Sequence, residues 1–412
     1  MVRRVKDVVT SIGSGTTPKS GEPRYYDNAN IPWLNSGDLN NGIINSTAKC
    51  ITPDALTDYP TLRFYSKGCV VVAMYGASIG KTGLLDIDTT VNQACCVLLP
   101  NLKYITSSYL HLLLQLSKER FLIESFGGTQ PNISQKIVAN LLIEVPSLRE
   151  QELQTAYLDR ECDKIGRQIE LLERKADAYK RLRRSIINRA VTRGLNPNAP
   201  LKPSSIPFLG DVPEHWDIRR IKSLFDERVE LSDTGMEDLL SVSEYYGVAK
   251  RADKVDGDNI SRSNSLEGYK LCYVDDMVSN IMLAWKGSLG RTAYNGIVSP
   301  AYGVYKPIDV LNSNYYHYLF RTEIYKGIFR TYSRGIIESR LRLYTPNFLA
   351  ILTVYPPFEE QCEIVAYLDE KCGKIDAIIE KIGKEVERLK ELKRSLINET
   401  VTGKRTINNI SK

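Results

Sequence analysis

The sequence predicts an α+β fold in which two similar globular segments are separated by two long helices packed as an antiparallel coiled coil. The first observation is a repeat, because the stretch 145–195 returns from Tyr355 onward. Gln151 aligns with Gln361, an offset of 210 residues that stays constant along the stretch. The second is heptad spacing in each copy, and the third is the run of short strand-like segments before each copy. An ungapped repeat of this length indicates two copies of one unit related by a pseudo-twofold.

Apolar residues at alternating gaps of four and three predict one long helix in each copy. They are Ile165, Ile169, Leu172, Ala176, Tyr179 and Ile186 in the first copy, and Ile375, Ile379, Ile382, Val386, Leu389 and Leu396 in the second. The pattern breaks at Arg183 and at Lys393. A helix of about 40 residues is roughly 60 Å long. Neither seam can be buried alone, so we expect the two helices to pack on each other and to hold the globular segments at opposite ends of a rod. A coiled coil between two chains is the alternative, which the repeat within one chain disfavours.

In chain order, residues 1–144 form the first globular segment and residues 145–195 the first long helix region. Residues 196–211, rich in Pro, Ser and Asn, read as a linker. Residues 212–354 form the second globular segment, and residues 355–412 the second long helix region and tail. Short motifs of the first segment return in the second, whereas the residues between them differ freely. This pattern suits two sites that read different things from a shared scaffold.

Composition sets the class of protein. The chain has 412 residues, 42% hydrophobic and 25% charged, which suits two or three globular units. Its net charge of +6 fits a polyanionic partner without establishing one. Eight cysteines without a CxxC pair and three distant histidines make a metal site unexpected and favour reduced thiols in a cytoplasmic protein. With no apolar run near 18 residues, we expect neither secretion nor membrane insertion.

Two motifs look like enzyme sites but do not fit them. Tyr75–Thr82 resembles a phosphate-binding loop, yet the spacing puts Tyr75 where the first glycine belongs, and Arg291 replaces Lys81 in the second copy. Tyr355–Phe358 resembles the loop of adenine methyltransferases, but a tyrosine cannot take the acceptor role of Asp or Asn toward a flipped base. We therefore expect no catalytic residue, no methyl transfer and no cofactor.

Basic and polar residues on turns are candidates for DNA contact. Hydroxyls, backbone N–H groups and lysines suit phosphates, the amides of Gln130 and Asn132 suit adenine, and arginine suits guanine. The predicted contacts, to phosphate or base, are Thr16, Lys19, Ser78, Lys81, Gln130, Asn132, Ser288, Arg291, Arg334 and Arg340. Solvated loops are the alternative for each. The basic run Lys180–Arg184 reads as a solvated helix face near a C-terminus, with a phosphate contact as the alternative.

Several motifs together carry a family resemblance that covers nearly the whole chain. They are Ile12–Pro18, Asn30–Asp38, Gly76–Lys81, Glu150–Glu152 with its long helix, Gly210–Trp216 and Gly287–Arg291. With these motifs the sequence resembles the DNA-specificity subunit of type I restriction–modification systems.

The resemblance implies two target-recognition domains, each reading one half of a split site in double-stranded DNA. The long helices would set the unread gap between the halves. It also implies that two methyltransferase subunits dock on the helical regions and that ATP-driven restriction subunits join them. Half-sites one turn apart need surfaces about 34 Å apart, a scale that a rod of roughly 60 Å meets. The expected role is a non-catalytic sequence reader, with a protein–protein scaffold as the main alternative and a nucleotide hydrolase as the third.

Overall fold

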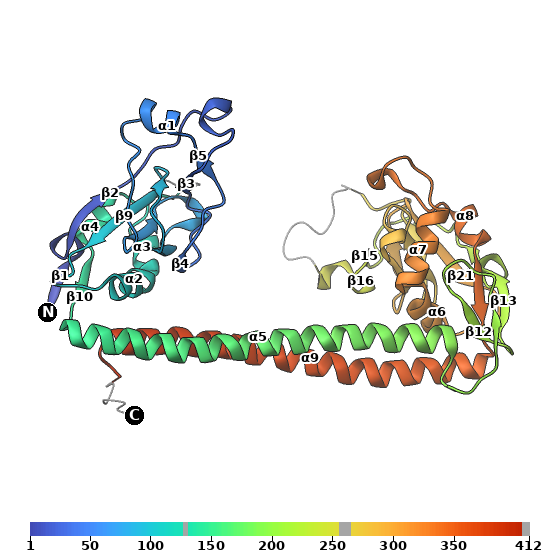
Figure 1. Cartoon of the computed structure of the whole chain (residues 1–412). Coiled ribbons are helices and arrows are strands. Elements are labelled where there is room, and N and C mark those ends of the chain that lie inside the picture. The colour runs from blue at the N-terminus through green and yellow to red at the C-terminus, as the bar shows by residue number, and fades with distance from the viewer. Residues whose placement is uncertain (127–130, 255–264, 406–412) are drawn as a thin grey trace. The chain divides into compact units, whose positions relative to one another are not determined.

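The computed structural model describes residues 1–126, 131–254 and 265–405. The chain divides into two compact units, each with its own share of both long helices (Figure 1). The first unit is Met1–Leu171 with Glu385–Lys412, and the second unit is Leu172–Lys384. Gln130, one of the predicted contacts, lies outside the described residues.

The first unit is built on a five-stranded sheet with the order β2-β9-β6-β7-β4. Its elements are β1 (Val2–Arg4), β2 (Val9–Gly13), β3 (Ile31–Leu34), β4 (Gly42–Ile44), β5 (Cys50–Ile51), α1 (Pro53–Asp58), β6 (Val70–Ala73), β7 (Thr82–Leu85), β8 (Thr90–Val91), β9 (Cys95–Pro100), α2 (Ser107–Leu116), α3 (Lys118–Ile123), α4 (Gln135–Asn140) and β10 (Leu142–Glu144). All four residues of the central strand β6 are buried, so it reads as a continuous apolar run rather than an alternating one. Helix α2 packs against β6 and β7.

The second unit is built on a four-stranded sheet with the order β14-β21-β18-β19. Its elements are β11 (Leu201–Pro203), β12 (Asp211–Pro213), β13 (Asp217–Arg220), β14 (Phe225–Glu227), β15 (Leu240–Ser243), β16 (Gly247–Lys250), β17 (Lys270–Cys272), β18 (Met277–Asn280), β19 (Leu289–Arg291), β20 (Gly296–Val298), β21 (Tyr302–Pro307), α6 (Ser313–Phe320), α7 (Glu323–Tyr332), α8 (Thr345–Ala350) and β22 (Leu352–Tyr355). Its core is aromatic, with Trp216, Phe225, Tyr315, Tyr316 and Phe320 all buried.

Four strands of the main sheet have the same order in the two units. Strand order β2-β9-β6-β7 in the first matches β14-β21-β18-β19 in the second. In each, three helices follow the sheet, and a last strand pairs antiparallel with the strand that comes just before the sheet in the chain, as β10 does with β1 and β22 with β13. A long helix then begins, which is α5 (Leu148–Arg193) or α9 (Phe358–Val401).

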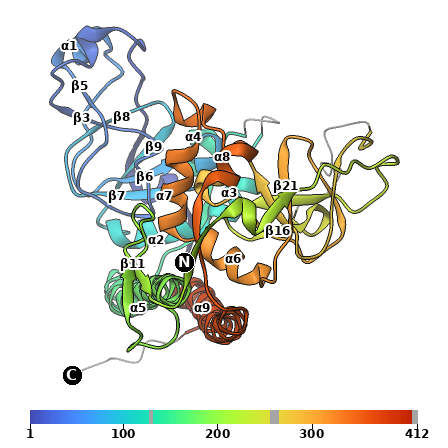
Figure 2. The ribbon, with the colours of Figure 1, turned by 90° about the vertical axis from the view of Figure 1, so that its right-hand side faces the viewer.

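Within each unit, its portions of α5 and α9 pack antiparallel (Figure 1), and Figure 2 shows the two helices side by side in end view. In the second unit Arg183 pairs with Asp376 at 3.0 Å. Further along α5, Ala190 and Val191 join the same core cluster as Ile364 and Leu368. In the first unit Arg405, beyond the end of α9, donates to the Tyr157 hydroxyl at 3.2 Å.

The predicted heptad positions are all buried or half-buried, which confirms the seam. The break at Arg183 also has a reason, because its guanidinium leaves the seam to pair with a carboxylate of the other helix.

The stretch predicted as a linker, residues 196–211, is folded instead. Strands β11 and β12 pair antiparallel. Ile206 is 4% exposed and Leu209 is 6% exposed, and both belong to the core of the second unit. The linker was predicted from the Pro and Ser content of this stretch. The burial of two apolar side chains stabilises a packed structure despite this composition.

Candidate nucleic-acid interface

The Gly-rich turn of the first unit joins two antiparallel strands, β6 and β7, through a 3-10 helix at Gly76–Ser78. A phosphate-binding loop joins a strand to an α-helix, whereas this turn joins two strands. The turn therefore differs from a nucleotide-binding loop in topology as well as in glycine spacing. Gly76 and Gly80 have φ of +61° and +74°, which is the left-handed region that favours glycine. Lys81 and Ser78 are half-buried, and among the described residues no ion pair involves Lys81.

The equivalent turn of the second unit corrects one prediction. Ser288 is 1% exposed, and its hydroxyl donates to the Val242 carbonyl at 3.0 Å. A hydroxyl in that position has no surface to offer DNA, so Ser288 serves to hold β15 against this turn. Arg291 is half-buried, and its Nε lies 2.7 Å from Asp275 Oδ1. Its charge is therefore already matched within the protein.

A second turn of the first unit borders a hollow of about 610 Å³. Thr17 and Ser20 of this turn line it. The neighbouring Thr16 accepts through its carbonyl from Trp33 Nε1, and its hydroxyl lies 2.6 Å from that of Thr61. Lys19 is exposed, and its backbone N–H donates to the Tyr59 hydroxyl at 3.0 Å. Trp33 and Lys49 line the hollow, which places aromatic, hydroxyl and cationic groups together.

Asn132 lies beside the Gly-rich turn of the first unit. Its backbone bridges to Phe126 and to Tyr75, and Gly76 N donates to Pro131 O at 2.9 Å. Sequence spacing alone does not place Asn132 near Lys81, because about 50 residues separate them. The fold brings the turn and Asn132 into one surface.

The second unit builds the same pairing of turn and loop. Its loop before α8 is closed by a backbone bridge between Arg334 and Arg342. Arg330 at the end of α7 lies over the ring of Trp285, 5.3 Å from its centroid, and Leu343 N donates to Ile281 O at 2.8 Å. Arg334 and Arg340 are both exposed on this loop.

Sequence reasoning missed the most exposed apolar residue of this loop. Ile336 is 102% exposed, and Ile337 is 53% exposed. Gly335, which precedes them, has φ +148°, and a Cβ there would lie 2.5 Å from Arg340 O, so glycine is required at this turn of the loop. The feature of the sequence that could have indicated this exposed apolar site is the pair of adjacent isoleucines between Gly335 and Glu338 in a basic loop. Apolar side chains flanked by arginines can pack against DNA bases.

A cation inside the second unit positions the surrounding loops. The Arg321 guanidinium donates to five backbone carbonyls, those of Ser243, Glu244, Tyr245, Gly287 and Leu289, at 2.9–3.1 Å. Burial lowers the pKa of Arg321 to about 10, which leaves it charged at neutral pH. In the first unit Gln115 takes a similar part and donates to Asn41 O at 2.6 Å. Arg321 thus ties the β15–β16 hairpin to the turn before β19.

The methyltransferase-like stretch Tyr355–Phe358 is structural. Tyr355 ends β22 and Phe358 begins α9. The Tyr355 hydroxyl donates to Val310 O at 2.9 Å, and the Arg219 guanidinium lies 3.8 Å from the centroid of its ring. Both the edge and a face of the ring are therefore occupied by the protein itself.

No helix within residues 1–126, 131–254 and 265–405 combines the length and apolar character that crossing a bilayer requires.

Comparison with known proteins gives concordant results. Residues 1–175 match the type I restriction modification DNA specificity domain. The chain is 24% identical over 406 residues to the type I restriction enzyme MjaVIII specificity subunit of Methanocaldococcus jannaschii, covering 92% of this chain and 87% of that protein. It is 21% identical over 179 residues to the EcoR124I/EcoR124II specificity subunit of Escherichia coli, covering 41% of this chain and 44% of that protein.

Solved structures show the same fold. A chain from a structure of type I R-M system assembly and conformational transition superposes with a TM-score of 0.70 at 14% identity, covering 97% of both chains. The HsdS subunit of Thermoanaerobacter tengcongensis superposes with a TM-score of 0.53 at 16% identity, covering 98% of this chain and 97% of that one. The domain match over residues 1–175, the relative matched over nearly its full length and the shared fold together make the chain similar to the specificity subunits of type I restriction–modification systems.

Proposed function

We propose that the chain reads a bipartite sequence in double-stranded DNA and directs partner methyltransferase and restriction subunits to it. One observation carries the proposal. The two units share the order of four strands in the main sheet and the same pairing of turn and loop, but the side chains on the paired surfaces differ. Lys81 and Asn132 stand in one unit, and Arg334, Arg340 and Ile336 stand in the other. A shared scaffold with unlike surfaces suits two different half-sites.

The chain acts as a reader and carries out no catalysis itself. Residues 1–144 take one half-site and residues 212–354 the other, while the helix regions 145–195 and 355–412 set the gap between them. Two methyltransferase subunits dock on the exposed faces of these helices, and restriction subunits complete the complex. We propose that the chain acts in the cytoplasm, where it would meet the host DNA.

Nine of the ten predicted residues remain proposed DNA contacts. Ser288 is no longer proposed, because it is buried. They are Thr16, Lys19, Ser78, Lys81, Gln130, Asn132, Arg291, Arg334 and Arg340. The exposed arginines of the second unit suit guanine or phosphate, and Lys81 suits phosphate. Arg291 would have to leave Asp275 to take part.

The deciding experiment is a genome-wide methylation map of the host with and without this gene. The expected result is the loss of one split methylated motif on deletion. Replacing residues 1–144 by the corresponding domain of a relative should then change one half of the motif and leave the other half intact. An unchanged map, together with a purified complex that binds proteins but no DNA at any salt concentration, would favour the protein–protein scaffold instead.

A further inference from the structure

The loop between α7 and α8, residues 334–342, carries an apolar tip that none of the proposed contacts uses. Ile336 is fully exposed there, and Ile337 beside it is more than half exposed. Single apolar side chains are common on protein surfaces and need no ligand to explain them. The charge and the shape of the loop around this adjacent pair therefore decide what the pair can bind.

Positive charge surrounds the apolar tip. Arg334 precedes the two isoleucines and Arg340 follows them, and both arginines are exposed. Among the described residues, the ion pair of this loop joins Arg330 to Glu338 and involves neither of these two arginines. The tip thus lies between two guanidinium groups whose charge is unmatched within the described protein. DNA has the complementary arrangement, because its phosphates are anionic and its base edges offer both hydrogen-bond acceptors and an apolar methyl group.

The base of the loop has the width of a two-stranded ribbon. Arg334 and Arg342 exchange two backbone hydrogen bonds, each 2.9 Å long, as residues in paired antiparallel strands do. Backbones paired in this way lie about 4.8 Å apart, and the side chains add to that width. The major groove of B-DNA, about 12 Å wide, admits a two-stranded ribbon, whereas the minor groove is only about 6 Å wide. The loop therefore fits the major groove, where the C5-methyl group of thymine is exposed.

The corresponding loop of the first unit has different residues. It is closed by a backbone bridge between Phe126 and Asn132, and the sequence 126–132 contains neither an isoleucine nor a charged residue. The proposed function places two copies of one methyltransferase subunit on the chain, so their contacts should recur in the two halves. A loop that differs between the halves in length, charge and apolar residue suits two unlike half-sites instead.

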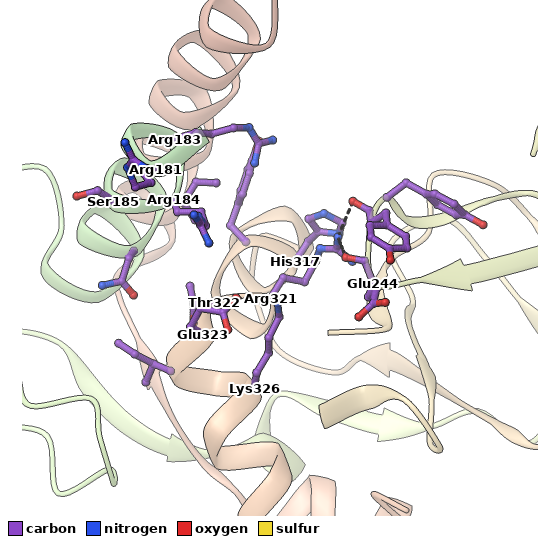
Figure 3. Close-up of a pocket in the computed structure, with 16 residues that line it drawn as sticks. Arg181, Arg183, Arg184, Ser185, Glu244, His317, Arg321, Thr322, Glu323 and Lys326 are labelled. Carbon is purple, nitrogen blue, oxygen red and sulfur yellow. Dashed lines mark hydrogen bonds and ion pairs between the residues drawn. The ribbon is translucent and has the colours of Figure 1, made fainter. Parts of the chain in front are cut away.

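The basic hollow beside α5 shows the opposite behaviour. Its volume is about 760 Å³, and Figure 3 shows it with Arg184 and Ser185 of α5 on one side. Three polar residues of its wall recur at the offset of 210, since Arg184, Ser185 and Asn188 return as Arg394, Ser395 and Asn398. Residues that are the same in both copies cannot distinguish two half-sites, so we assign no sequence reading to this hollow.

We propose that Ile336 reads a thymine in the half-site bound by the second unit, by packing against the C5-methyl group in the major groove. The inference rests on the proposed DNA-reading function and names one base that the second unit reads. Contact with this methyl group distinguishes thymine from the other three bases, which carry no methyl group at that place. Arg334 and Arg340 would contact guanine or phosphate on either side of the thymine.

The test uses the full chain in complex with its methyltransferase subunits and a duplex that carries the recognised site. The half-site of the second unit is the one that stays intact when residues 1–144 are exchanged. Each thymine of that half-site, on either strand, is replaced in turn by uracil, which lacks only the methyl group. Dissociation constants are measured for the wild type, for Ile336→Ala and for the matched control Ile308→Ala. Ile308 is an exposed isoleucine of the same unit that follows β21 and lies outside the loop.

In the wild type, one replacement of thymine by uracil should weaken binding about fourfold, the effect expected for the burial of one carbon atom. Ile336→Ala should bind the thymine and uracil duplexes equally well at that position, because alanine ends at the Cβ atom and does not reach the methyl group. Ile308→Ala should keep the fourfold difference. Thermal melting should show both variants folded, since both isoleucines are exposed.

Three outcomes would overturn the proposal. A wild-type complex that tolerates every uracil, or a half-site without thymine, would mean that no methyl group is read. A fourfold difference that persists in Ile336→Ala would assign the contact to another residue. Equal weakening of the thymine and uracil duplexes by Ile336→Ala would mean that the side chain touches something other than the methyl group. A wild-type complex that binds the recognised and a scrambled duplex alike would contradict the proposed function itself, and that result needs no variant.

Discussion

Gln361 offers a sharp test of how each globular segment is joined to its long helix. It is fully buried at the start of α9. Its Oε1 accepts from Asn312 N at 2.9 Å, and its Nε2 donates to Pro356 O at 2.8 Å. Gln151 repeats this arrangement in the first unit, where it accepts from Thr106 N and donates to Pro146 O. In both units the glutamine ties the N-cap of a domain helix to the proline that precedes the long helix.

Replacing Gln361 by leucine keeps the bulk of the side chain and leaves two backbone groups without a partner. Each unsatisfied buried group costs about 1–3 kcal/mol. The apolar replacement offsets part of that sum, so we expect a loss of about 2–4 kcal/mol in the free energy of unfolding. For a unit of this size the melting temperature should fall by roughly 5–15 °C.

The assay is thermal and urea unfolding followed by circular dichroism, with Gln168→Leu as the control. Gln168 is exposed on α5, so the same substitution there should change stability by less than about 0.5 kcal/mol. If Gln361→Leu were as mild as the control, the repeated glutamine would not be a structural clamp, and the alignment of the two copies would lose its physical meaning at this position.

Three further predictions follow from the site and the helices. Lys81→Ala should weaken binding to any DNA sequence and reduce the salt slope by about 1; a change confined to base preference would contradict a phosphate contact. Four residues inserted into both α5 and α9 add roughly 6 Å of rise to each helix, so the methylation map should show a longer gap between the half-sites, and an unchanged gap would refute the role of the helices as a spacer. Burial, together with nearby Arg321, lowers the pKa of His317 to about 3, against about 6.5 in the unfolded chain. Between these two pH values the unfolded state binds more protons than the folded state. Acidification from pH 7 to 4.5 should therefore lower the unfolding free energy of the second unit by up to about 1.4 kcal/mol per pH unit below 6.5. In urea unfolding, His317→Asn should lose less stability over this range, and equal pH profiles for the two proteins would refute a buried neutral histidine.

The predicted contacts show where sequence reasoning succeeds and where it stops. Arg334 and Arg340 are exposed, as a contact residue must be. Ser288 carries the same motif position as the half-buried Ser78 but is enclosed by β15. A motif predicts the turn and its residue types, whereas the elements that cover the turn come from elsewhere in the chain. Arg321 escaped notice for the same reason, because its five acceptors are scattered between Ser243 and Leu289.

The repeat, the long helices and their seams could be predicted from the sequence, and together with the short motifs they carry the resemblance to type I specificity subunits. These features are periodic and local, and heptad spacing or a constant offset survives without knowledge of distant partners. Tertiary structure alone decided that residues 196–211 are packed, that Arg183 pairs with Asp376, and that Asn132 lies beside the 75–81 turn. Those outcomes depend on long-range packing, in which burial of a few apolar side chains or one cross-helix ion pair overrides local composition.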